Sequence, residues 1–301
     1  MSRLADLAEL VRAPAALSVP GDVLAGAAAA GALDRRTPAL AGASVLLYWA
    51  GMAANDWADR RLDAVERPER PIPSGRIHPV AAFGAAAGLT AAGLAVAGAA
   101  GGRRATAVAV PLAAAIWGYD LLAKNTAAGP AVMAACRGLD VLLGASPGAG
   151  RRGTRDAGRG AVRGPSAGRG LVRALPAALT VAAHTWTVTA LSRREVSGAD
   201  RRLPRATLAG TALVAASALS RTDPVPAALA AGYATRYGSA QARVLGDPSP
   251  ARVRAAVGAG ITGLPALQGA LTARAGARIL GLAVAAAAPL GRRLARLISP
   301  T

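Results

Sequence analysis

Long apolar runs limit what this chain can fold into more than any other feature of its sequence. The runs are about 17 to 22 residues long, the length of a helix that crosses the hydrocarbon core of a bilayer. Short charged or Pro/Gly-rich breaks separate them, whereas a soluble helix combines an apolar stripe with a polar face. We therefore predict an all-α, polytopic membrane helical bundle that forms one domain over residues 1–301. Its transmembrane helices are expected near residues 14–33, 38–56, 79–100, 104–123, 129–147, 171–191, 206–221, 224–241, 252–273 and 276–296.

Alanine and glycine dominate these runs, and aromatic residues make up only 3% of the chain. Small side chains let helices approach closely inside a membrane, so we expect a tightly packed bundle in the lipid bilayer. The formal net charge is +19, but most arginines lie in the breaks between runs. Membrane topology explains this charge better than binding to a nucleic acid does, and no nucleic-acid partner is expected.

Two arginine-rich breaks predict the orientation of the bundle in the cell membrane. One follows the second run, from Arg60 to Arg76, and the other follows the sixth, from Arg193 to Arg205. Four spans separate them, so both lie on one face, which the positive-inside rule assigns to the cytoplasm. Residues 148–170 fall on the opposite face and are rich in Arg and Gly. This composition cannot pack, which predicts a disordered loop, and it lacks the stacking aromatics of an RNA-binding segment.

An acidic stretch, residues 55–77, begins where the second run ends and holds five of the 16 acidic residues of the chain. A helix that turns about 100° per residue gathers several polar side chains of this stretch on one arc: Asn55, Asp56, Asp59, Asp63 and Glu66. Carboxylates stacked in this way repel one another. We therefore expect positive charge, from side chains or a metal ion, to lie between them.

The same stretch carries a specific resemblance. Asn-Asp-x-x-Asp-x-x-x-Asp at residues 55–63, followed by Arg67-Pro-Glu-Arg-Pro-Ile-Pro-Ser-Gly, resembles the first signature of the UbiA superfamily of intramembrane prenyltransferases. Other segments resemble the family in the same order along nearly the whole chain: Arg12-Ala-Pro, Pro20-Gly-Asp, Tyr119-Asp120 with Lys124, Cys136-Arg137-Gly138-Leu139-Asp140, and His184-Thr-Trp-Thr leading to Ser192-Arg-Arg-Glu. The last segment is similar to the EboC-like branch.

The resemblance implies both a fold and an activity. The family fold has nine helices, so the run at 276–296 is a C-terminal addition or a miscount, and we expect nine to ten spans. The implied activity is Mg²⁺-dependent transfer of a prenyl group from a polyprenyl diphosphate to an acceptor that the sequence does not identify. The second acidic motif of the family departs here: Glu195 and Asp200 are five residues apart instead of four, and only Glu195 is well placed.

Prenyl transfer requires groups that neutralise the leaving diphosphate, and Mg²⁺ held by carboxylates suits this task. The expected catalytic and metal-binding residues are Asp56, Asp59, Asp63 and Glu195. The expected diphosphate-binding residues are Asn55, Arg70, Lys124 and Arg193. Polar residues inside or beside apolar runs are expected to line the pocket for the acceptor or the prenyl chain: Tyr119, Asp120, Arg137, Asp140 and His184.

Some of these residues keep a second interpretation. Arg137 and Asp140 lie three residues apart and could neutralise each other, and Asp120 could bond a neighbouring helix instead of the acceptor. His184 is more often an interior histidine with its hydrogen bonds satisfied than a base. At the level of the whole protein, the alternative is a non-catalytic carrier or flippase for a prenylated or lipid-linked metabolite, which would keep the same fold.

Overall fold

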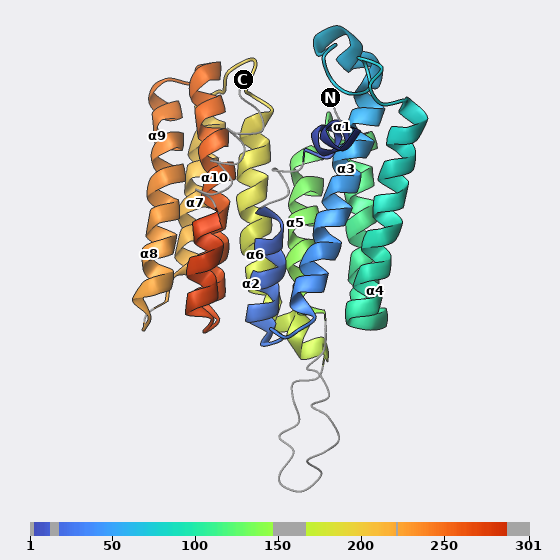
Figure 1. The fold of residues 1–301 in the computed structure, drawn as a ribbon. Coiled ribbons are helices and arrows are strands. Elements are labelled where there is room, and N and C mark those ends of the chain that lie inside the picture. The colour runs from blue at the N-terminus through green and yellow to red at the C-terminus, as the bar shows by residue number, and fades with distance from the viewer. Residues whose placement is uncertain (1–2, 13–17, 147–166, 221, 288–301) are drawn as a thin grey trace, which may run out of the picture.

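The computed structural model describes residues 3–12, 18–146, 167–220 and 222–287, and these residues fold into helices joined by turns. Most helices run along one common axis, side by side (Figure 1). In chain order they are α1 (Arg3–Leu10), α2 (Pro20–Ala30), α3 (Thr37–Glu66), α4 (Pro79–Gly118), the π-helical turn η2 (Tyr119–Ala123), α5 (Gly129–Ala145), α6 (Ala167–Ser192), α7 (Arg202–Ala218), α8 (Pro224–Tyr233), the π-helical turn η3 (Ala234–Gly238), α9 (Ser239–Gly246), α10 (Pro250–Arg274) and a last helix, Arg278–Ala287. The all-α prediction is confirmed.

The element α4 is a hairpin of two antiparallel helices that meet at Gly102 (Figure 1). Gly102 has φ 64° and ψ −159°, a backbone conformation that only glycine adopts without strain. The two halves then lie side by side, and Trp117 of the second half donates a hydrogen bond of 3.0 Å to the Thr90 hydroxyl of the first. The two spans predicted at 79–100 and 104–123 are therefore separate helices.

Each predicted span coincides with a helical segment, although several boundaries differ. Among the described residues, three helical segments are long and apolar enough to cross a membrane by length and composition alone. They are Thr37–Glu66, Gly168–Ser192 and Pro79–Ala123, which contains both halves of the α4 hairpin. The span predicted to end at residue 56 continues to Glu66, so the acidic stretch is helical throughout. Residues 167–170, predicted as loop, belong to α6, while residues 14–17, 148–166 and 288–296 lie outside the described part of the chain.

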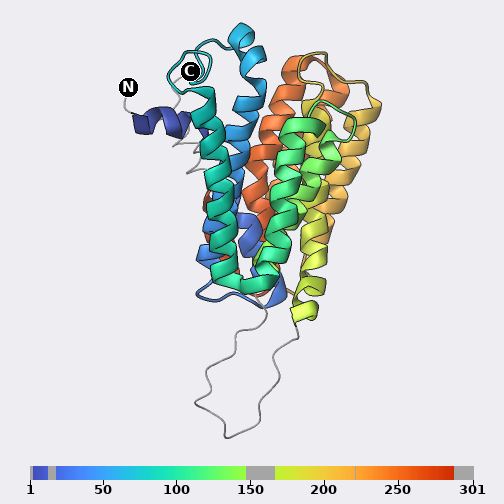
Figure 2. The same cartoon turned by 90° about the vertical axis from the view of Figure 1, so that its right-hand side faces the viewer.

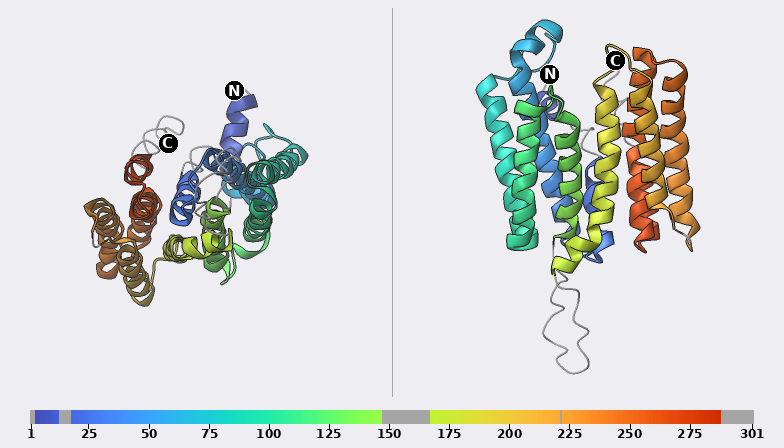
Figure 3. Two further views of the ribbon diagram at one scale, coloured as in Figure 1. Left: turned by 90° about the horizontal axis from the view of Figure 1, so that it is seen from below. Right: turned by 180° about the vertical axis from the view of Figure 1, so that it is seen from behind.

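The bundle is held together by two hydrophobic clusters and by close helix contacts. One cluster is built from α2 to α5 around Leu47 and Leu112, and the other lies mainly among α6 to α10 around Leu191 and Leu267. Between the two, α2 packs directly on α5, since a Cβ atom at Gly26 would overlap the backbone of α5. Figure 3 shows how these helices are arranged when the bundle is viewed along its axis. The expected packing through small residues is present at this contact.

The short helix α1 projects sideways from the bundle, near the end that carries the turns after α3 (Figure 2). Leu4 is 78% exposed. The polar side of α1 is tied down by Arg76, whose guanidinium lies 2.6 Å from Asp6 and 2.7 Å from Glu9. These ion pairs hold α1 against the turns that follow α3.

The same end of the bundle carries the connections after α3, η2, α6 and α9. Arg193 donates to the backbone carbonyl of Thr126, and the Ala199 N–H donates to the carbonyl of Pro248 at 3.1 Å. The arginine-rich breaks after the second and sixth spans are therefore at one end, as the sequence predicts. Figure 1 shows α5 ending and α6 beginning at the opposite end.

Candidate active site

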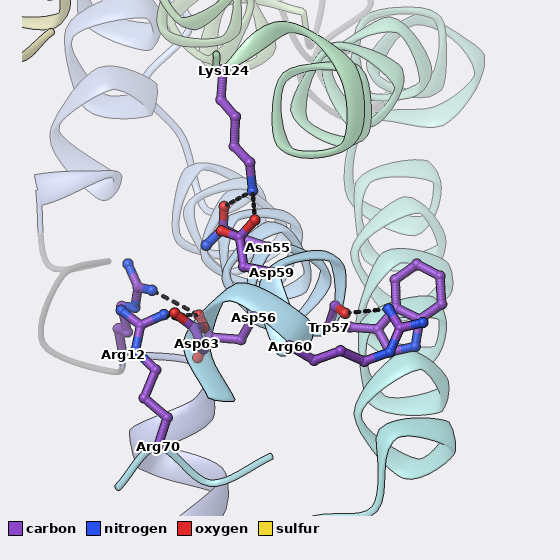
Figure 4. Close-up of polar contacts among 9 residues, drawn as sticks. All are labelled: Arg12, Asn55, Asp56, Trp57, Asp59, Arg60, Asp63, Arg70 and Lys124. Atoms are coloured by element: carbon purple, nitrogen blue, oxygen red, sulfur yellow. Dashed lines mark hydrogen bonds and ion pairs between the residues drawn. The ribbon is translucent and has the colours of Figure 1, made fainter. Parts of the chain in front are cut away.

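The last turns of α3 form an acidic surface with cations along it (Figure 4). Asp56 and Asp63 are only 4% and 3% exposed. The Arg70 guanidinium bridges them, with Nη1 2.7 Å from Asp63 Oδ2 and 3.3 Å from Asp56 Oδ1. Asp56 also accepts from Arg12 at 2.7 Å. The repulsion expected between carboxylates on one arc is thus offset by side-chain cations.

A third cation approaches from the other side of this surface. Lys124 Nζ lies 2.6 Å from Asp59 Oδ1 and 3.0 Å from Asn55 Oδ1. Lys124 is placed there by η2, in which its N–H bonds the carbonyl of Tyr119, five residues earlier, at 2.9 Å. This π-type turn adds a residue to the helix and redirects the side chains that follow, a feature often found at functional sites.

Arg12 is a site residue that the sequence analysis did not identify as one. It lies 44 positions before Asp56 and has φ 46°, in the left-handed region. The resemblance of Arg12-Ala-Pro to the first helix of the family was the available signal, but it said nothing about which side chain Arg12 contacts. The tie between Arg76 and α1 holds Arg12 close to α3.

The predicted metal site is not assembled in this structure. Within the described ranges there is no group of three or more His, Cys, Asp or Glu side chains that could hold a metal ion. Instead, Asp56, Asp59 and Asp63 each bind a cation through one carboxylate oxygen. Their second oxygens make no hydrogen bond in the part of the chain that is described. Free carboxylate oxygens close to an amide oxygen are donors that suit Mg²⁺, so the residue types fit this ion.

The turn after α6 places Glu195 at the same end of the bundle, but outside the surface formed by α3. Its backbone carbonyl accepts from Arg254 at 2.8 Å. Partial burial raises the pKa of the Glu195 carboxyl, and the charge of Arg254 offsets part of that rise. Arg193, on the same turn, bonds the Thr126 carbonyl next to Lys124.

Asp200 has a structural role at the start of α7. Its Oδ1 accepts from the N–H groups of Leu203 at 2.9 Å and Arg202 at 3.1 Å. These two bonds lower the pKa of Asp200, and they satisfy the first free N–H groups of α7. Asp200 therefore acts as a helix cap.

Asp120 and Tyr119 lie one layer deeper in the bundle than Lys124. Asp120 is 9% exposed and lines a small cavity of about 40 Å³. The other lining residues are mostly apolar: Tyr48, Gly51, Met52, Ile116, Tyr119, Met133 and Cys136. This arrangement places a carboxyl group and an apolar pocket directly beside the acidic surface.

The two other charged residues of the expected pocket belong to a separate network. Arg137 does not neutralise Asp140. Its Nε lies 2.7 Å from Asp22 on α2, and Asp140 instead accepts a hydrogen bond from Ser44 on α3. Gln268 of α10 donates to Asp22 at 2.6 Å. The local pairing suggested by the sequence is wrong because neighbouring helices offer both side chains better placed partners.

His184 is buried in the other half of the bundle. Its Nδ1 lies 2.8 Å from the Tyr233 hydroxyl, and its ring packs against Tyr233 and Tyr237 with centroid distances of 5.3 and 5.5 Å. Tyr237 in turn donates to Thr187 at 3.2 Å. These contacts support the interior, hydrogen-bonded interpretation of His184.

Trp57 has a structural environment on the outer side of α3. Its ring lies 5.0 Å from that of Phe83, which lies 6.0 Å from Trp117. The Arg60 guanidinium stacks over Trp57 at 4.7 Å. Trp57 therefore packs α3 on α4 and is turned away from the acidic surface (Figure 4).

Comparison with known proteins places these features in a family. Residues 18–246 match the model of the UbiA prenyltransferase family. A digeranylgeranylglyceryl phosphate synthase of Methanothrix thermoacetophila is 43% identical over 95 residues, which are 31% of this chain and 36% of that protein. The chain thus aligns with about a third of the length of this curated relative.

Solved structures share the fold over almost the whole chain. The structure of a digeranylgeranylglyceryl phosphate synthase has a TM-score of 0.66 at 17% identity and covers 91% of this chain and 99% of its own. A UbiA homologue of Archaeoglobus fulgidus, bound to GPP and Mg²⁺, has a TM-score of 0.62 at 14% identity, with 93% and 99% covered. The family match extends over well more than half of the chain, from α2 to α9, and includes the aspartates of the acidic surface with Arg70 and Lys124, while Arg12 precedes it. The protein belongs to the UbiA prenyltransferase family.

Proposed function

We propose that this protein is a membrane-embedded enzyme that transfers a prenyl group from a polyprenyl diphosphate to an acceptor, with Mg²⁺ as cofactor. The observation that carries the proposal is the meeting of Arg12, Arg70 and Lys124 on the aspartates of α3. Three cations on one surface match the charge of a diphosphate leaving group. The family match and the neighbour bound to GPP and Mg²⁺ support this assignment.

Each cation has a defined task in this proposal. Lys124 contributes a compact charge, whereas Arg12 and Arg70 offer forked donors that suit phosphate oxygens. When bound, Mg²⁺ would neutralise negative charge on the leaving diphosphate. Asp56, Asp59 and Asp63 are the proposed ligands for it, and Glu195 is proposed to complete the site from the turn after α6.

The rest of the bundle orients the donor and keeps water out. The prenyl chain is proposed to lie among the alanine- and glycine-rich helices below the acidic surface. The active site is proposed to face the cytoplasm, because the arginine-rich turns after α3 and α6 lie at its end of the bundle. Arg137, Asp140 and His184 line deeper parts of the interior and support the pocket from there.

The experiment uses the full chain in lipid nanodiscs with labelled prenyl diphosphates, Mg²⁺ and a membrane extract, and identifies the labelled product by mass. Wild type should form a prenylated product, and chelation of Mg²⁺ should prevent it. Binding of a non-hydrolysable prenyl thiolodiphosphate is measured in parallel. Asp59→Asn should weaken it at least about tenfold, or about 1.4 kcal/mol, because Asp59 is a proposed ligand of the Mg²⁺ that neutralises the diphosphate.

The matched control is Glu66→Gln, which removes an exposed carboxylate near the C-terminal end of the same helix. It should bind the thiolodiphosphate like wild type. Tight binding of the donor by wild type without release of diphosphate under any condition would support the carrier instead of the enzyme. Unchanged affinity in Asp59→Asn would reject the acidic surface as the donor site.

A further inference from the structure

The carboxyl group of Asp120 lies in a position that none of the contacts described so far explains. Its side chain points at α3, where Oδ2 lies 3.0 Å from the position that a Cβ atom of Gly51 would take. The absence of a side chain at Gly51 makes room for Ile116 Cγ2, which lies 2.5 Å from the same position, and for this carboxylate. Gly51 precedes Asn55 by one helical turn, so the carboxylate is about 6 Å from the level of Asn55, on the interior side.

The residues around Asp120 do not satisfy the hydrogen-bonding capacity of its carboxylate. Within the described residues, no hydrogen bond or ion pair reaches its carboxylate, although Asp120 could have bonded a neighbouring helix. An ionisable side chain in the apolar interior of a membrane protein is costly and usually has a function. The charged groups that act on it from a distance are Lys124, Arg12, Asp59 and Asp56, which are the groups of the proposed donor site.

The backbone directs the side chains of Asp120 and Lys124 towards the same face of their segment. Both belong to the segment that begins with η2, and they are four residues apart, the separation at which side chains share a helix face. Lys124 reaches the outer, polar level at Asn55 and Asp59. Asp120 reaches the inner level, in the cavity that contains Met52, Ile116 and Met133. A donor held by Lys124 thus presents its diphosphate to the outer level and its reactive carbon to the inner one.

We propose that Asp120 is the general base of the transfer and that the acceptor is a membrane-soluble compound with a hydroxyl group. In this step the bond between C1 of the prenyl chain and the diphosphate oxygen breaks, and its electron pair leaves with the diphosphate. The acceptor oxygen bonds to C1, and the hydroxyl proton passes to the carboxylate of Asp120. The proposal rests on the proposed function and adds the acceptor class and the residue that takes its proton.

A base is needed for this class of acceptor because a prenylated hydroxyl carries a positive charge until its proton leaves. General base catalysis typically contributes a factor of about 10² to 10⁴. An acceptor that is already ionised, such as a carboxylate, has no proton to lose and does not need the base. The two kinds of acceptor therefore separate a proton-transfer role of Asp120 from a role in packing or in charge stabilisation.

The experiment compares wild type and Asp120→Asn in nanodiscs with geranylgeranyl diphosphate, Mg²⁺ and two probe acceptors, 1-decanol and decanoate. Asp120→Asn keeps the shape of the side chain and breaks no hydrogen bond that the structure shows. We expect transfer to 1-decanol to fall at least about a hundredfold. Transfer to decanoate, binding of the thiolodiphosphate, and slow release of diphosphate without any acceptor should stay within about threefold. Asp200→Asn, the same chemical change at an exposed carboxylate, is the control.

Each other result overturns the inference in a distinct way. Equal losses with both acceptors, or loss of diphosphate release, would assign Asp120 to charge stabilisation or packing. Wild-type rates with both acceptors would leave Asp120 without a catalytic role, and wild type that releases diphosphate but never prenylates 1-decanol would exclude a hydroxyl acceptor. Failure of the proposed function itself looks different, because wild type would then release no diphosphate from the donor.

Discussion

The buried ion pair between Asp22 and Arg137 gives the most exacting test of the structure. Asp22 is fully buried on α2, and the Arg137 side chain on α5 is 7% exposed. At 2.7 Å, two unit charges attract by about 6 kcal/mol at the effective dielectric constant of 20 that describes protein sites best. Replacing Arg137 by methionine keeps most of the side-chain volume and removes the charge.

The loss of unfolding free energy in Arg137→Met cannot exceed the free energy needed to protonate Asp22. Once unpaired, Asp22 can take up a proton, which costs a carboxyl group of ordinary aspartate acidity about 4 kcal/mol at pH 7 and about 1.5 kcal/mol at pH 5. We therefore expect Arg137→Met to lose about 3–4 kcal/mol of unfolding free energy at pH 7. At pH 5 the loss should be smaller, because protonating the unpaired Asp22 becomes easier.

A double-mutant cycle measures which acid Arg137 pairs with. Unfolding free energies are obtained from SDS titration in mixed micelles, followed by circular dichroism, for the single variants Arg137→Met, Asp22→Asn and Asp140→Asn and for the two doubles. Arg137 should couple to Asp22 at least twice as strongly as to Asp140, whose carboxylate bonds Ser44 instead. Stronger coupling to Asp140, or a loss that does not depend on pH, would refute the network.

Two further predictions concern the end of the bundle that carries the acidic surface. Glu195→Gln should lower transfer at least about a hundredfold if Glu195 acts on the donor, whereas Asp200→Ala should leave transfer unchanged and lower only the stability, because a helix cap is lost. Transfer assays with SDS titration measure both effects, and two fully active variants would contradict the role of Glu195. A cysteine placed at Arg67 should resist an impermeant thiol reagent added to intact cells, and one placed at Asp34 should react; the reverse pattern would invert the topology.

The acidic surface was predictable because it depends on one helix. Helical spacing fixes that Asp56, Asp59 and Asp63 share an arc, and the need for cations between them follows from repulsion. The structure confirms both features, with Arg70 bridging the first and last of these residues. Lys124 was predicted only through the family resemblance, since nothing in its own surroundings in the sequence points to α3.

The partners that come from distant parts of the chain were not predictable in the same way. Arg12 meets Asp56 across 44 positions, and this contact depends on where α1 docks. Arg137 faces α2 instead of its own neighbour in sequence, because the rotation of α5 in the bundle decides which side chains meet. Asp140 turns to Ser44 for the same reason. Local spacing limits the possible partners of a buried charge, while helix packing selects among them.

The ion pairs of the acidic surface imply that Mg²⁺ and donor bind cooperatively. As the surface stands, three aspartates balance three cations, so either ligand alone leaves some of these charges without partners. Arg70 and Lys124 can turn to a diphosphate at little cost only if the carboxylates they release gain a new positive partner. We expect Mg²⁺ to tighten binding of the prenyl thiolodiphosphate at least about tenfold, within the usual range of coupling energies, and the thiolodiphosphate to tighten Mg²⁺ binding by the same factor, as linkage requires. Calorimetric titrations in both orders measure the two factors. Independent binding would show that the cations do not exchange between aspartates and donor, and the surface would then be a fixed salt-bridge network.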